Sequence, residues 1–182
     1  TCIYEGTSEV LEMTMYRGRW QEHLKSRGRY YLDMADKLDE LHAKEPKVGA
    51  HASALGLRAL AAILEECRLH KLTRHQHVTF KLGKLICSAE TAANFSTAAA
   101  ARKYSETIRF DREGWQAMAR IFAREAALNT AMEGLALVLG AADSAGNLAD
   151  AVNIEAIQTE QKGMIADMDL VAVKLKQTFK AK

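Results

Sequence analysis

The chain has 182 residues, of which 48% are hydrophobic and 26% charged, and its formal net charge is +2. This length and composition are typical of a globular domain with one sizeable core. The balanced charge argues against a nucleic-acid partner. No run of about 18 apolar residues predicts a membrane span, and no basic start followed by an apolar segment predicts a secretory signal.

The chain carries three scattered cysteines, Cys2, Cys67 and Cys87. An odd, scattered set is more typical of a reducing compartment than of a disulfide framework. We therefore expect a cytoplasmic location, or the mitochondrial matrix in a eukaryote. The simplest interpretation of each cysteine is a small buried hydrophobe.

The first distinctive stretch is Ile-Tyr-Glu-Gly-Thr-Ser-Glu-Val, residues 3–10. Gly6 can take a positive φ or let the backbone approach another group closely, and Glu5 stands directly before it. The hydroxyl residues that follow can cap a helix, and a carboxylate in the first turn suits the helix dipole. These capping and first-turn positions are Thr7, Ser8 and Glu9. The residues alone thus predict a capped helix start, preceded by a carboxylate, Glu5, that takes no part in the capping.

The same eight residues closely resemble the C-terminal signature of flavin-dependent acyl-CoA dehydrogenases, I-[YF]-E-G-T-[SN]-x-[IV]. In that family the glutamate removes the α-proton of the acyl-CoA thioester. The resemblance therefore implies that Glu5 is the catalytic base and that Gly6 contacts the substrate. Apolar cover from Ile3 and Tyr4 would raise the pKa of the base toward neutrality. The resemblance also implies FAD contacts, made by Thr7, Ser8 and Glu9.

For the whole protein, the resemblance implies α,β-dehydrogenation of acyl-CoA in fatty acid β-oxidation. Electron-transfer flavoprotein would be the electron acceptor, and the enzyme would be a homo-oligomer. Family members hold the flavin mostly in a β-domain and helices that precede the signature. Because the signature begins two residues after Thr1, we expect this chain to be a C-terminal fragment that is inactive alone.

About 150 residues follow the signature, which is similar to the very-long-chain branch with its helical C-terminal extension. The extension would mediate dimer contacts or peripheral membrane contact. Short family members have Gln-Arg just after the signature, whereas this chain has Leu11 and Glu12. The subunit and flavin contacts that family members make through those two positions are therefore not expected of this chain.

Apolar residues recur at helical spacing almost throughout, and no stretch alternates as a strand would. The sequence therefore predicts an all-α, antiparallel helical bundle of about six helices, the last four forming a four-helix bundle. Asp111 and Asn147 are the expected N-caps of the last two helices. We expect residues 1–27 to end the catalytic domain and residues 28–182 to form the helical extension. The expected helices cover about residues 8–22, 31–44, 48–70, 74–104, 112–139 and 148–175.

Two further clusters allow a functional interpretation. The stretch 17–29 is basic and could contact CoA phosphates or an anionic membrane, although solvated charge around a linker is the commoner explanation. The second cluster offers four possible zinc ligands at the turn between the third and fourth helices. It lacks a paired Cys-x-x-Cys, so polar turn residues are the better interpretation and we predict no metal. Its members are Cys67, His70, His75 and His77.

Two alternatives to the dehydrogenase remain open. One is a non-catalytic helical interaction or dimerisation module, in which Glu5 only precedes a helix cap. The other is a relative with different flavin chemistry, such as an acyl-CoA oxidase, because the signature does not separate these activities.

Overall fold

The computed structural model describes residues 8–101, 111–142 and 146–180, and every regular element in these ranges is a helix. The predicted all-α helical bundle is confirmed. The elements are α1 (Ser8–Lys25), α2 (Arg29–Lys44), η1 (Pro46–Val48), α3 (Ala50–Leu69), η2 (Leu72–Arg74), α4 (Gln76–Ala100), α5 (Arg112–Ala141), α6 (Leu148–Val152), α7 (Ile154–Glu160) and α8 (Met164–Lys180).

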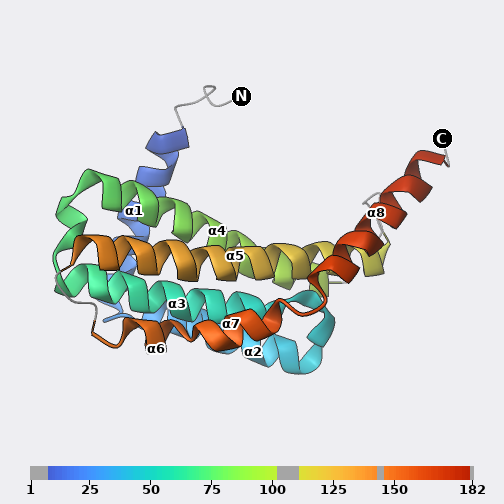
Figure 1. The fold of residues 1–182 in the computed structure, drawn as a ribbon, viewed down its shortest axis with the longest axis horizontal. Helices are drawn as coiled ribbons and strands as arrows, with labels where there is room; N and C mark the ends of the chain where they lie inside the picture. The colour runs from blue at the N-terminus through green and yellow to red at the C-terminus, as the bar shows by residue number, and fades with distance from the viewer. Residues whose placement is uncertain (1–7, 102–110, 143–145, 181–182) are drawn as a thin grey trace.

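The long helices α2, α3, α4 and α5 lie side by side, with α3 packed against each of the other three (Figure 1). The short helices α6 and α7 cover α3 on the opposite side from α4. Two helices depart from this arrangement. Helix α1 crosses α4 near one end of the bundle, and α8 leaves the bundle at the other end.

The core lies around α3, whose inward positions are large and fully buried. Leu60, Ile63 and Leu64 in α3, and Leu82 and Ile86 in α4, are completely buried, as the apolar spacing predicts. At the C-terminal end of α5, Val138 is buried, whereas the neighbouring Leu139 is 63% exposed. Neighbouring helical positions differ by about 100°, so only one of the two can face the core.

Small residues let the central helices approach closely. A Cβ on Gly56 in α3 would lie 3.1 Å from the Cα of Ala127 in α5. The buried face of α5 consists mostly of alanines, which keep this helix close to α3 and α4. The predicted N-cap of α5 is also present, because the side chain of Asp111 accepts a hydrogen bond from the N–H of Gly114 at 2.9 Å.

The predicted single helix over 148–175 is wrong, because the chain breaks it into α6, α7 and α8. Asn153 has φ 54° and Gly163 has φ 84°, and a left-handed residue ends a helix. Asn147 stands at the N-cap of α6 as predicted, but its side chain makes no capping hydrogen bond. Instead the side chain of Asn153 accepts from the N–H of Ala156 at 3.4 Å, which starts α7.

Candidate functional site

The residues predicted to carry the chemistry lie at the edge of the described chain. Glu5, Gly6 and Thr7 fall outside the described residues. Ser8 and Glu9 open α1, but their side chains are also outside the described part. Helix α1 itself is described from Ser8 onward, so the signature leads directly into it. The way α1 is held therefore determines where the signature is attached.

A buried carboxylate joins α1 to the bundle. Glu90 on α4 is 7% exposed and accepts two hydrogen bonds from the Arg19 guanidinium on α1, at 2.5 Å and 3.0 Å. The Tyr31 hydroxyl on α2 donates to the same carboxylate at 2.8 Å. One side chain thus ties three helices together, and the two parallel bonds to the guanidinium fix the relative orientation of α1 and α4.

Tyr31 and Arg19 keep fixed ionisation states in this cluster. Burial raises the pKa of Tyr31, with the Glu90 charge acting in the same direction. The hydrogen bond to Glu90 raises the pKa of Arg19. The phenol therefore stays neutral and the guanidinium stays charged at neutral pH. A neutral phenol and a charged guanidinium that both bind one carboxylate are suited to holding helices together rather than to acid–base catalysis.

Helix α1 also meets α4 through backbone contact. A Cβ on Gly83 in α4 would lie 2.6 Å from the carbonyl oxygen of Glu12, so the crossing requires glycine. Beyond this crossing the first turns of α1 rise above α4 (Figure 1). The side chains of Val10 and Leu11 there are each 57% exposed. Two exposed apolar side chains thus lie where the signature ends.

The basic stretch 17–29 is partly neutralised within the protein. Arg19 binds Glu90, and the Arg29 guanidinium donates to Asp33 at 2.6 Å. Lys25 donates to Glu22 at 3.2 Å. Lys25 and Arg29 are exposed at the turn between α1 and α2, which fits the interpretation as solvated charge around a linker, whereas Arg19 binds a buried carboxylate. The proposed contacts with phosphates or an anionic membrane stay predictions for the rest of the stretch.

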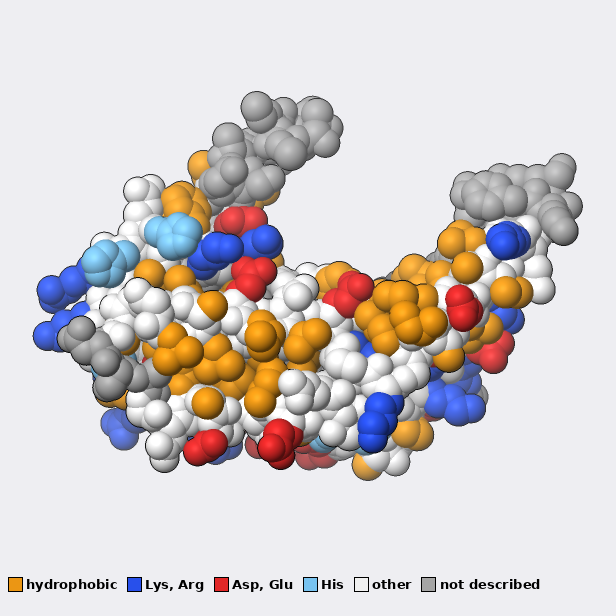
Figure 2. Space-filling model, viewed as in Figure 1, with side chains coloured by type: hydrophobic (Ala, Val, Ile, Leu, Met, Phe, Trp, Pro, Cys, Tyr) orange, Lys and Arg blue, Asp and Glu red, His pale blue; other side chains and the backbone are white. Residues whose placement is uncertain are grey.

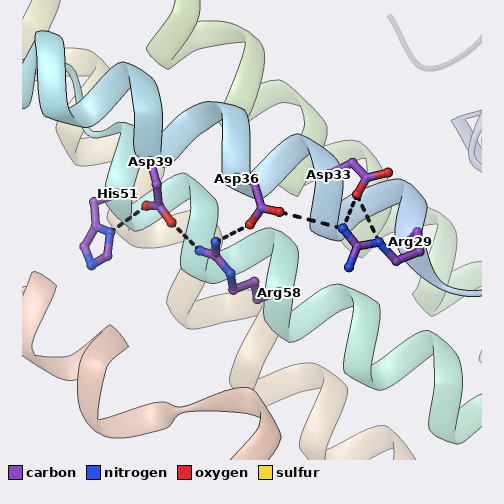
Figure 3. Close-up of polar contacts among 6 residues, drawn as sticks. All are labelled: Arg29, Asp33, Asp36, Asp39, His51 and Arg58. Carbon is purple, nitrogen blue, oxygen red and sulfur yellow. Dashed lines mark hydrogen bonds and ion pairs between the residues drawn. The ribbon is translucent and has the colours of Figure 1, made fainter.

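A ladder of charged groups runs along the exposed side of the α2–α3 contact (Figure 3). Asp39 on α2 accepts hydrogen bonds from two α3 side chains, the His51 ring at 2.9 Å and the Arg58 guanidinium at 2.7 Å. Burial acts to raise the pKa of Asp39, but these two hydrogen bonds outweigh it and lower the pKa. Exposed ion pairs each contribute roughly 0.2–1 kcal/mol, so the ladder orients α2 on α3 without dominating stability. Its members are Arg29, Asp33, Asp36, Asp39, His51 and Arg58.

The possible zinc ligands do not converge. Cys67 is buried in α3, and burial raises the pKa of its thiol to about 12. His70 instead approaches Glu66 at 3.3 Å, and both His75 and His77 are exposed. Across the described ranges, no group of three or more His, Cys, Asp or Glu side chains could hold a metal ion.

A different histidine, His23 on α1, is 1% exposed. Its ring stacks on Trp20 at 5.6 Å between centroids, and its Nε2 lies 3.3 Å from the Glu65 carboxylate. Burial lowers the pKa of His23, against the opposing effect of the Glu65 hydrogen bond. The ring is therefore neutral at pH 7, and its stability contribution depends on pH near neutrality.

Helix α8 is held to α5 by a second buried carboxylate. Asp167 is 8% exposed and accepts hydrogen bonds from Arg120 at 2.9 Å and Arg124 at 2.5 Å. Burial acts to raise the pKa of Asp167, but the two guanidinium hydrogen bonds outweigh it and lower the pKa. Further along α8, Lys174 pairs with Asp111 and lies 3.0 Å from Glu113. These contacts fix one side of α8 against the first turns of α5.

Sequence reasoning did not single out Glu90 or Asp167. The signal was present in both cases, as an acidic residue within a stripe of apolar ones. Glu90 follows Ile86 by one turn on the buried face of α4, and Asp167 lies between Met164 and Val171 on α8. A carboxylate on a buried face is retained only when a partner satisfies it, but the sequence does not say which arginine that is.

No protein-family model, curated protein or solved structure matches the chain. Within the described ranges, no helix has both the length and the apolar character needed to cross a bilayer.

Proposed function

We propose that this chain is the C-terminal part of a flavin-dependent acyl-CoA dehydrogenase acting on long acyl chains, and that Glu5 is its catalytic base. The observation that carries the proposal is the run Ile-Tyr-Glu-Gly-Thr-Ser-Glu-Val at residues 3–10. Helix α1 begins within this run, at Ser8, which supports the proposal because a hydroxyl residue then lies at a helix start, where backbone N–H groups can receive a phosphate.

The chemistry required of Glu5 is the removal of the weakly acidic α-proton of a thioester. A carboxylate can remove this proton when apolar surroundings raise its pKa and when it lies within hydrogen-bond reach of the proton. FAD, when bound by the complete enzyme, accepts the hydride from the β-carbon. Gly6 would leave room for the substrate. Thr7, Ser8 and Glu9 would contact the cofactor, with Glu9 acting through its backbone because an acidic side chain repels phosphate.

A base is effective only if its position is fixed. The Arg19–Glu90–Tyr31 cluster and the Gly83 crossing hold α1 on the bundle, and thereby the helix to which the signature is attached. In the proposed enzyme the bundle would orient this helix toward the segments that hold the flavin. The exposed Val10 and Leu11 side chains would pack against those segments.

The proposal is tested on the full-length protein. We expect it to purify yellow, and Glu5→Gln to keep the bound flavin but lose its reduction by acyl-CoA. The matched control is Glu22→Gln, whose side chain lies on the surface of α1 in a pair with Lys25. Undiminished flavin reduction in Glu5→Gln would refute the assignment of the base.

The gene sequence gives an independent test. The region upstream of Thr1 should encode a β-rich segment able to hold the flavin. An initiator methionine directly before Thr1, together with a colourless protein, would instead favour the non-catalytic interaction module. A yellow protein that reduces oxygen at the expense of acyl-CoA, without an added acceptor, would identify the oxidase alternative.

A further inference from the structure

Helix α8 has a packed side and an open side. Asp167 and Lys174 face α5, as described above. The helix then rises away from the bundle (Figure 1), and apolar side chains are visible along the projecting part in the space-filling view (Figure 2). Among the described residues, the exposed large hydrophobic side chains of α8 are Ile165, Met168, Val173 and Leu175.

Three of these side chains and one alanine form a continuous stripe. Ile165, Met168, Ala172 and Leu175 follow one another at spacings of three, four and three residues. This is the spacing of the seam along which two helices pack in a coiled coil. Ile165 is 68% exposed, Met168 38% and Leu175 41%, so the described chain leaves a large part of the stripe open.

Two opposite charges flank the stripe on the side away from α5. Asp169 and Lys176 are both exposed, and neither makes an ion pair with any side chain that the structure describes. They are seven residues apart, which is about 10.5 Å along a helix axis, too far for one to reach the other. The helix thus presents an apolar stripe with one negative and one positive charge at its edge.

We propose that α8 pairs with α8 of a second copy of this chain, antiparallel, about a two-fold axis passing between Ala172 and Val173. In that pairing Asp169 of each copy lies opposite Lys176 of the other, so the surface is self-complementary. A parallel pairing would instead set Asp169 and Lys176 opposite Met164 and Val171 of the partner copy, and both charges would stay unpaired.

The apolar stripe fits the same axis. An antiparallel partner places its Leu175 between Met168 and Ala172, and the small Ala172 near the axis lets the two helices approach. A membrane is a poorer occupant, because helices that lie on anionic lipid carry Lys and Arg on the polar face, whereas one of the two charges beside this stripe is acidic. The occupant that satisfies both charges is a second α8.

A single helix pair buries little area compared with obligate dimers. The dimer should therefore be weak, with a dissociation constant on the order of 10 µM. Sedimentation equilibrium of the 182-residue chain over about 1–300 µM should show a monomer–dimer equilibrium. This test needs neither flavin nor substrate, so its result does not depend on the proposed catalytic function.

Charge exchange tests the geometry. Asp169→Lys or Lys176→Asp alone places like charges opposite each other twice, and should weaken the dimer by about tenfold or more. The double variant Asp169→Lys/Lys176→Asp should restore it, and so should an equimolar mixture of the two single variants. Circular dichroism should show that the helix content of each variant is unchanged.

The apolar stripe is tested by Met168→Asp, which should abolish the dimer. The matched control is Val173→Asp, at a position that is 50% exposed (Met168 is 38% exposed) and lies roughly 120° around α8 from the stripe. Because it lies off the seam, it should leave the dissociation constant within about twofold. A chain that stays monomeric from about 1 to 300 µM would overturn the proposal. So would an equal weakening of the dimer by Met168→Asp and Val173→Asp, or a mixture of Asp169→Lys and Lys176→Asp chains that does not pair. A monomer whose binding to anionic vesicles is lost in Met168→Asp would identify a membrane as the occupant instead.

Discussion

Arg19 and Glu90 lie 71 residues apart in the sequence, and their two parallel hydrogen bonds hold α1 on α4. Glu90 is almost completely buried, whereas the Arg19 side chain is about one-third exposed. Because Tyr31 uses the same carboxylate, the loss of Glu90 affects three helices at once.

Glu90→Gln should lower the free energy of unfolding by about 2 kcal/mol, because it leaves the Arg19 charge without its partner. Tyr31→Phe removes only one hydrogen bond and should cost about 1 kcal/mol. Urea unfolding followed by circular dichroism measures both. Glu133→Gln, which breaks an exposed pair with Lys81, is the control and should cost less than either. A Glu90→Gln protein as stable as this control would contradict the role given to the cluster.

Gly83→Ala should destabilise the α1–α4 crossing by about 1–3 kcal/mol, because the added Cβ would lie 2.6 Å from the Glu12 carbonyl oxygen. Gly18→Ala is the matched control on α1. A Cβ there meets nothing within 4 Å, so the change should stabilise the helix by about 0.5–1 kcal/mol. Hydrogen exchange in α1 should rise in the first variant and fall in the second. The free energy of unfolding must fall in Gly83→Ala and rise in Gly18→Ala; a change in the same direction in both variants would contradict the prediction.

His23 should make stability depend on pH near neutrality. Burial lowers its pKa in the folded state, so the unfolded chain binds a proton more readily. The folded state is therefore most stable above the unfolded value of about 6.5, and it loses stability as the pH falls from that value toward the lower folded pKa. Thermal unfolding of His23→Gln between pH 5 and pH 7.5 should show a shallower dependence. Replacing the exposed His77 by Gln should leave the wild-type dependence in place.

Asp167→Asn should release α8 from α5, because two arginines lose the charge that pairs them. The folded-state pKa of Asp167 is lowered, so its contribution is complete above the unfolded value of about 3.9 and is lost as the pH falls through the folded value. At pH 7 the protection of α8 amides from exchange should fall in the variant, while α3 stays protected. Asp150→Asn, at an exposed position on α6, serves as the control. Unchanged protection of α8 would show that Asp167 does not hold it.

The sequence by itself determined the fold class and most of the core. The 3–4 spacing of residues such as Leu60, Ile63 and Leu64 predicts a buried helical face, and the structure buries them completely. Asp111 was also predictable as a cap, because capping depends only on the residue and its local neighbours. The same local spacing predicted one long helix after residue 147, because a break in the helix does not interrupt the spacing of the apolar residues. The left-handed conformations of Asn153 and Gly163 end two helices there instead.

Only the tertiary structure decided which charged residues are buried and with what partner. Glu90 meets Arg19 and Asp167 meets Arg120 and Arg124 because helices distant in the sequence pack side by side, and no local pattern encodes those pairings. The packing of α8 likewise decided that Ile165, Met168 and Leu175 lie outside the core, although their spacing predicts a buried stripe. Periodicity shows that a helix has an apolar side, and the arrangement of the other helices decides what covers it.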